Sequence, residues 1–142
     1  MTEIINNQQK IKLDWQIFQT FTENALSQIP ETNNKTVTVA FVSDHKMRAL
    51  NNEFRSKNST TDVLSFPFEA AEFEADENTL GDIVISIEQA QKQATENDLE
   101  VETEIKQLIL HGILHLCGYD HETDNGEMNR RELELRDTLR AV

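Results

Sequence analysis

Three of the four histidines fall within eleven residues, in the segment HGILHLCGYDH. His111 and His115 are four residues apart, so on a helix they share one face and can hold a metal ion between two imidazoles. Gly118 permits a positive φ angle, so the chain can reverse there and bring His121 to the same ion. Three neutral nitrogens with an open fourth position are typical of catalytic zinc. The spacing predicts one Zn²⁺ per chain, bound by His111, His115 and His121.

The residue that follows the first of these histidines bears on the kind of chemistry. The spacing H-x3-H-x5-H, with a glycine three residues after the second histidine, is also that of the metzincin proteases. Those proteases place a glutamate general base directly after the first histidine, where this chain has Gly112. The metal ligands are therefore predicted without the peptidase base. A zinc hydrolase of another class stays as an alternative, and it would need a substitute base.

Three blocks of sequence resemble the YbeY family, bacterial rRNA maturation factors described as zinc-dependent endoribonucleases. The blocks are LNNEFRSKNSTTDVLSFP at 50–67, LGDIVIS at 80–86 and HGILHLCGYDHE at 111–122. Their order and spacing fit the family, so the resemblance spans about residues 37–140. The chain departs from the family pattern at three positions, where Gly, Asp and Pro are usual: Ser56, Asn58 and Thr60.

The resemblance implies a fold, a site and a function. The fold is a zincin-like α/β (α+β) domain, with a small mixed sheet and the histidine helix beneath the cleft. The zinc ligands are His111, His115 and His121, and Arg55 is the functional arginine. The implied activity is single-strand-specific, metal-dependent endoribonuclease action in 16S rRNA 3′-end maturation and ribosome quality control. The alternative is a ribosome-assembly or RNA-binding factor whose zinc is mainly structural.

The chemistry of RNA cleavage agrees with a role for Arg55. A phosphodiester gains negative charge in its transition state, which a nearby guanidinium stabilises. Arg55 lies in a short basic stretch, Lys46–Lys57, of net charge +3. Asp120 and Glu122 flank His121 and are suited to hydrogen-bond a ligating imidazole. Whether water or the RNA 2′-hydroxyl is the nucleophile stays open.

Negative charge is concentrated in one part of the chain. The formal net charge is −13, and the segment Glu69–Glu104 holds twelve acidic residues and one basic residue. Such a segment is a solvated surface or a docking face for a basic partner, such as proteins of the small ribosomal subunit. We expect it to face away from the metal cleft, because anionic RNA could not approach it.

Length and composition indicate a single globular domain over residues 1–142, with 37% hydrophobic and 27% charged residues. The longest apolar run is four residues, Val39–Val42, which excludes a transmembrane helix of about 20 residues. Met1–Lys12 has no apolar signal segment, and the one cysteine, Cys117, cannot form an intrachain disulfide. We therefore expect a cytoplasmic protein with no membrane partner. The oligomeric state is left open.

Periodicity places these residues on a mixture of helices and strands. Ser86 and Gln89 form a capping box, Asp44 can cap a short helix, and Gly118 suits the end of the histidine helix. Glu69–Asn78 is predicted to be an acidic loop or a poor hairpin. Strands are predicted over 35–42, 62–68 and 81–86, and helices over 13–29, 44–54, 86–97 and 102–117 and from 124 towards the C-terminus.

Overall fold

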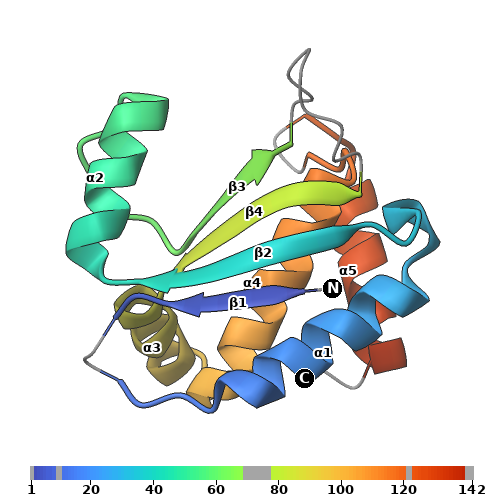
Figure 1. Ribbon diagram of the computed structural model, residues 1–142, viewed down its shortest axis with the longest axis horizontal. Coiled ribbons are helices and arrows are strands. Elements are labelled where there is room, and N and C mark those ends of the chain that lie inside the picture. Colours follow the sequence, from blue (N-terminus) through green and yellow to red (C-terminus); the bar gives the residue numbers. More distant parts are fainter. Residues whose placement is uncertain (1, 9–10, 69–77, 121–122, 140–142) are drawn as a thin grey trace.

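The computed structural model describes residues 2–8, 11–68, 78–120 and 123–139, and these form a four-stranded mixed sheet packed with helices (Figure 1). The predicted α/β class is confirmed. The strands are β1 (Glu3–Asn6), β2 (Thr36–Val42), β3 (Val63–Pro67) and β4 (Thr79–Ser86). The helices are α1 (Trp15–Gln28), α2 (Asp44–Arg55), α3 (Ile87–Glu96), α4 (Val101–Leu116) and α5 (Glu127–Leu139), with a 3-10 turn, η1, at Pro30–Thr32. None of these helices is long and apolar enough to cross a membrane.

The sheet has the order β1-β2-β4-β3. The first three strands in this order run parallel, and β3 pairs antiparallel with β4 at the edge. Alternate side chains of β2 and β4 enter a large core, which α1, α3, α4 and α5 complete. These inward-facing residues are Val37, Val39, Phe41, Ile83 and Ile85.

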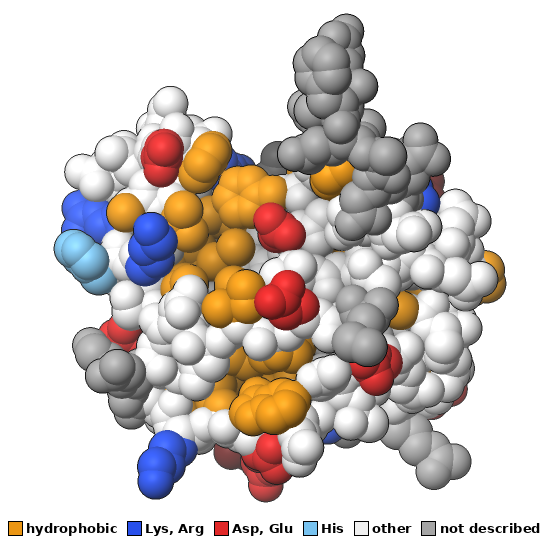
Figure 2. All heavy atoms as spheres, viewed as in Figure 1, with side chains coloured by type: hydrophobic (Ala, Val, Ile, Leu, Met, Phe, Trp, Pro, Cys, Tyr) orange, Lys and Arg blue, Asp and Glu red, His pale blue; other side chains and the backbone are white. Residues whose placement is uncertain are grey.

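The opposite sheet face is covered in part by α2. Val42, Leu64 and Val84 form a smaller cluster there with Met47 of α2. Figure 2 shows the apolar side chains that gather on this face beside α2. The histidine helix α4 lies on the other face, so the sheet separates the two clusters.

The ends of the helices follow local hydrogen bonds, mostly as predicted. The Ser86 hydroxyl accepts from the Gln89 N–H at 3.3 Å at the start of α3, and Gly118, at φ +103°, follows the end of α4. The prediction that Asp44 caps α2 is wrong. Ser43 caps the helix by accepting from the Lys46 N–H. The Asp44 carboxylate instead accepts from hydroxyl and amide groups at the start of α3 and in the loop before β3: Ser86, Gln89 and Thr60.

Strand β1 was not predicted. It has four residues, of which only Ile4 and Ile5 are apolar, so no alternating pattern marks it. Its backbone pairs with β2 in parallel, from Glu3 opposite Thr38 to Asn6 opposite Phe41. Tertiary pairing therefore produces this strand. Most of the predicted acidic loop, residues 69–77, lies outside the described residues.

Helix α4 approaches β4 closely at Gly112. A Cβ atom built at Gly112 would lie 2.8 Å from Cγ2 and 3.0 Å from Cδ1 of Ile83, which is fully buried. Glycine inside a helix costs roughly 0.5–1 kcal/mol relative to alanine. The close packing of α4 on the sheet explains why glycine stands here despite that cost.

We expect Gly112→Ala to lower the free energy of unfolding by about 1–3 kcal/mol, because the buried Ile83 has little room to move. Urea denaturation measures the loss. In an Ile83→Ala background the clashing carbons are absent, so the same substitution should be neutral or stabilising through the helix propensity of alanine. An equal loss in both backgrounds would contradict the close approach at this position.

Candidate active site

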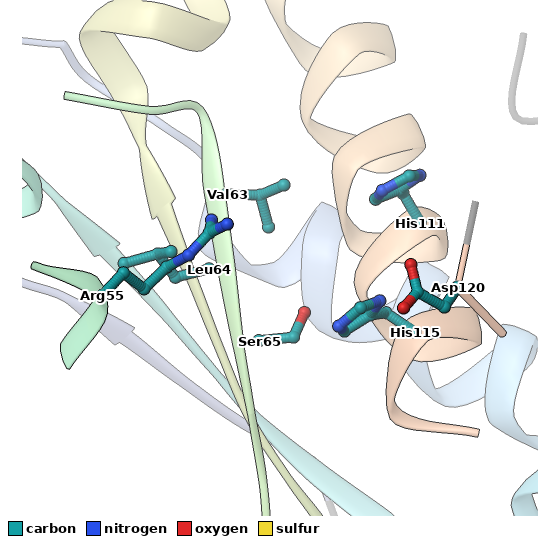
Figure 3. A pocket seen from close by; sticks show the side chains of 7 residues that line it. All are labelled: Arg55, Val63, Leu64, Ser65, His111, His115 and Asp120. Carbon is teal, nitrogen blue, oxygen red and sulfur yellow. The ribbon is translucent and has the colours of Figure 1, made fainter. Parts of the chain in front are cut away.

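A cavity of about 320 Å³ lies between α4 and the edge strand β3. Figure 3 shows His111 and His115 projecting from α4 on one side and Arg55, at the end of α2, on the other. The remaining lining comes from β3 and from the residues that follow α4: Val63, Leu64, Ser65 and Asp120. The structure thus brings three of the four predicted site residues around one space.

The periodicity of α4 turns both histidines towards this cavity. Glu104, Leu108, His111 and His115 follow one another at spacings of three and four residues and share one side of the helix. Ile105, Ile109 and Ile113, on the other side, are fully buried in the core. The prediction that the two histidines share a face is confirmed.

The third predicted ligand, His121, lies outside the described residues, as does Glu122. Within the described part of the chain, no group of three or more His, Cys, Asp or Glu side chains is arranged to hold a metal ion. Asp120 lines the cavity together with both histidines. Figure 3 shows its carboxylate beside the two imidazoles. The role of these residues as ligands and supports stays a prediction.

A carboxylate from α5 faces the first histidine. Nδ1 of His111 lies 3.6 Å from Oε1 of Glu132, which in turn lies 3.6 Å from an NH2 nitrogen of Arg136. The Glu132 side chain is 11% exposed. A carboxylate at this position can help to orient the imidazole. Sequence analysis missed Glu132, because it lies 21 residues from His111 on another helix and no motif marks it.

The segment that leaves α4 is held by Glu31 of η1. The Tyr119 hydroxyl donates to Oε2 of Glu31 at 2.9 Å, and Arg131 of α5 donates to both carboxylate oxygens at 2.8 and 2.9 Å. The bond from Arg131 lowers the pKa of Glu31 to about 2, although burial opposes the shift. The bidentate contact from Arg131 fixes Glu31, which in turn holds Tyr119, the residue before Asp120, against η1.

Arg55 is the last residue of α2 and is exposed. It makes no hydrogen bond or ion pair with any other described residue, so its guanidinium remains available to an anion. Ser56 follows at φ +55° and ψ 31°, a left-handed conformation that glycine adopts without strain. This agrees with the glycine expected there from the family pattern. The loop beyond is tied back to α2 by a bond from the Asn51 amide to the Ser59 carbonyl at 2.9 Å.

The prediction that the acidic segment faces away from the cleft is wrong at its end. A second cavity, of about 440 Å³, adjoins the first, shares Arg55, Val63 and His111 with it, and is also lined by Glu104. Glu104 enters it because it lies seven residues before His111, two turns away on the same side of α4. This spacing was the signal in the sequence that could have placed Glu104 at the site.

Two residues near the histidines are unsuited to catalysis. Position 112 faces Ile83 at a distance that leaves no room for a glutamate side chain, so the peptidase base has no place in this fold. Burial raises the pKa of the Cys117 thiol to about 11, which keeps it protonated. Cys117 packs beside the main core, as a small apolar residue would.

Comparison with known proteins agrees with this geometry. The sequence model of the family described as "Endoribonuclease YbeY" matches residues 3–140. The chain belongs to the YbeY family. The resemblance found in the sequence is therefore confirmed.

Relatives and a solved structure extend the match. Proteins named Endoribonuclease YbeY are 49% identical in Nautilia profundicola, over 72% of this chain and 70% of that protein, and 34% identical in Syntrophus aciditrophicus, over 93% and 85%. The solution structure of TM1509 from Thermotoga maritima superposes with a TM-score of 0.67 at 27% identity. It covers 98% of this chain and 89% of that one. The relatives named Endoribonuclease YbeY support the interpretation of this chain as a nuclease.

We expect the Glu31 contact to make stability depend on pH in acid. The pKa of Glu31 is about 2 in the folded chain and near 4.3 when unfolded. The contact therefore contributes fully above pH 5, and its contribution falls as the pH decreases towards 2. The side chains of Arg131 and Glu31 are 24% and 29% exposed. After solvent screening we therefore expect the contact to contribute about 1–2 kcal/mol to the free energy of unfolding. Urea denaturation between pH 2 and 7 measures the free energy of unfolding, which should fall less steeply with decreasing pH in Glu31→Gln than in the parent protein. Parallel curves for the two proteins would contradict the role of this contact.

Proposed function

We propose that this protein is a cytoplasmic zinc-dependent endoribonuclease, specific for single strands, that acts in 16S rRNA 3′-end maturation and ribosome quality control. The observation that carries the proposal is the cavity in which two imidazoles of α4 face the Arg55 guanidinium. That pairing suits a metal ion and a phosphodiester side by side. Membership of an endoribonuclease family supports the same activity.

The residues present fit a zinc ion. His111 and His115 supply two neutral nitrogens from one helix face, and Glu132 faces the ring of His111, as carboxylates do behind ligating histidines. His121 would be the third ligand. Bound by these residues, zinc would supply Lewis-acid polarisation of a phosphoryl oxygen.

The chain's own residues provide the rest of the chemistry. The Arg55 guanidinium can form a bidentate contact with phosphate oxygens and stabilise the charge that develops on them. The Ser65 hydroxyl lines the same cavity and can hydrogen-bond the substrate. A space of about 320 Å³ is at the small end of ligand pockets and suits one nucleotide of an extended strand. This supports single-stranded RNA as the substrate.

The acidic segment supports a second contact, with basic proteins of the small ribosomal subunit. Its net charge, −11 over residues 69–104, would attract Lys- and Arg-rich surfaces and repel RNA from that side. Glu104 is not part of this docking surface, since it lines a cavity beside the histidines. The docking surface would hold the enzyme near its RNA.

We expect the purified protein to contain one zinc ion per chain. His111→Ala, His115→Ala and His121→Ala should each lose most of the metal, because each removes one of three ligands. His45→Ala is the matched control, since His45 is exposed and lies outside the cavity. Metal analysis by mass spectrometry gives the occupancy. Full zinc occupancy in His121→Ala would contradict the three-ligand site.

We expect Arg55→Ala to slow RNA cleavage about 10²–10³-fold, as removal of one charge-stabilising donor does, with zinc content unchanged. Arg55→Lys should recover little, because an ammonium cannot reproduce the bidentate contact. Single-turnover cleavage of 3′-extended rRNA, with and without chelator, measures both effects.

Arg48→Ala is the matched control for these rates, since Arg48 lies on the same helix and bonds to Asn58 outside the cavity. A 2′,3′-cyclic phosphate product would identify the 2′-hydroxyl as the nucleophile. Cleavage at the parent rate by zinc-loaded Arg55→Ala would refute the role of Arg55, and cleavage unaffected by chelator would refute metal dependence.

A further inference from the structure

The second cavity beside the histidines has a lining unlike the first. It is bounded by α3, α4, α5 and the start of β3, and it adjoins the histidine cavity, with which it shares Arg55, Val63 and His111. Its volume of about 440 Å³ lies within the range of small-molecule sites, ~300–1,000 Å³. The residues found only in this cavity are mostly acidic or amide-bearing: Thr61, Asp62, Gln93, Glu104, Gln107, Leu108, Glu132 and Arg136.

Glu104 is the unusual member of this lining. It is only 7% exposed, and no hydrogen bond or ion pair joins its carboxylate to another described residue. Burial and the nearby Asp62 carboxylate raise its pKa, and Arg136 opposes the shift. The side chain borders the cavity, so its carboxylate is open to a ligand that donates hydrogen bonds.

The charges of the lining disfavour phosphate as that ligand. Three carboxylates, from Asp62, Glu104 and Glu132, outnumber the two guanidinium groups of Arg55 and Arg136. A second phosphate would meet net repulsion, whereas a neutral group rich in N–H donors would be attracted. A nucleobase is such a group, and it is one bond from the sugar whose phosphate would lie beside Arg55.

We propose that this cavity is a base-recognition subsite in which Glu104 selects guanine next to the cleaved phosphate. Guanine presents two neighbouring donors, N1–H and the 2-amino group, which a carboxylate can accept together. Adenine and cytosine place an acceptor beside their single amino donor, and uracil flanks its N–H with two carbonyl groups, so each would set lone pairs against the carboxylate. Single-stranded RNA exposes these edges for recognition.

The apolar part of the lining supports this ligand. Leu108 lies one turn after Glu104 on the same side of α4 and is buried, so it can contact the face of a base ring. The Gln93 amide donates to the Asp62 carboxylate at 3.2 Å, which keeps that second acceptor in place at the wall. Glu104 is thus a carboxylate with no hydrogen-bond partner among the described residues, in a wall that also holds the apolar Leu108 and the unpaired Nε of Arg136.

This inference rests on the proposed nuclease function, and the test separates the two. The probes are single-stranded octauridylates that carry one guanine at each position in turn, and the same set with inosine, which lacks the 2-amino group. Affinity is measured by fluorescence anisotropy at one salt concentration, and single-turnover cleavage is measured alongside. We expect the zinc-loaded protein to prefer guanine over inosine at one position by roughly 10- to 100-fold.

Glu104→Gln should reduce this preference to within about 3-fold, because the amide replaces one acceptor with a donor. Glu102→Gln is the matched control, since Glu102 lies on the same helix but outside the cavity, and it should keep the full preference. If Glu104→Gln does not fold, the comparison of guanine with inosine probes on the parent protein still tests the subsite.

The outcomes are distinct. Equal affinity for guanine and inosine at every position, or a preference that survives in Glu104→Gln, overturns the guanine subsite while RNA cleavage stands. Equal loss of affinity for both probe sets in Glu104→Gln assigns Glu104 a structural role and also overturns the proposal. A parent protein that neither binds nor cleaves any probe or 3′-extended rRNA overturns the proposed function itself.

Discussion

The contact between α4 and β4 determines where the rest of the site can lie. Because Gly112 has no side chain, the helix packs against Ile83 of the central sheet. That orientation turns the side of α4 bearing Glu104, His111 and His115 towards the edge strand β3. Both cavities lie along this one side of the helix, so a single packing contact helps to position both histidines and Glu104. The same contact removes the space in which a peptidase would place its base.

Local signals in the sequence predicted much of this arrangement. The i, i+4 pair of histidines, the glycine after α4 and the capping box at Ser86 each depend on residues close in the chain, so the sequence shows them directly. Strand β2 was predicted from its partial alternation and β-branched residues, and β4 from its short apolar run. Arg55 came from the family resemblance, since an exposed arginine at the end of a helix carries no pattern of its own.

The features that were missed depend on distant parts of the chain. Strand β1 exists because its backbone pairs with β2, and its own residues show too little alternation to reveal it. Glu132 approaches His111 only because α5 packs against α4. Glu104 was misplaced for a different reason: it was considered as one charge in an acidic segment, whereas its position on the helix face decides its surroundings. Helical phase outweighs local composition for a residue so close to the histidines.

The link between Glu31 and Arg131 joins residues 100 positions apart. It fastens the segment after α4, and it forms only when α5 has packed. Glu132 of the same helix also reaches His111. Two contacts of the cleft therefore depend on the packing of α5 against α4. Any local opening that releases α5 from α4 therefore removes both supports at once, so the histidine site shares the local stability of this one helix.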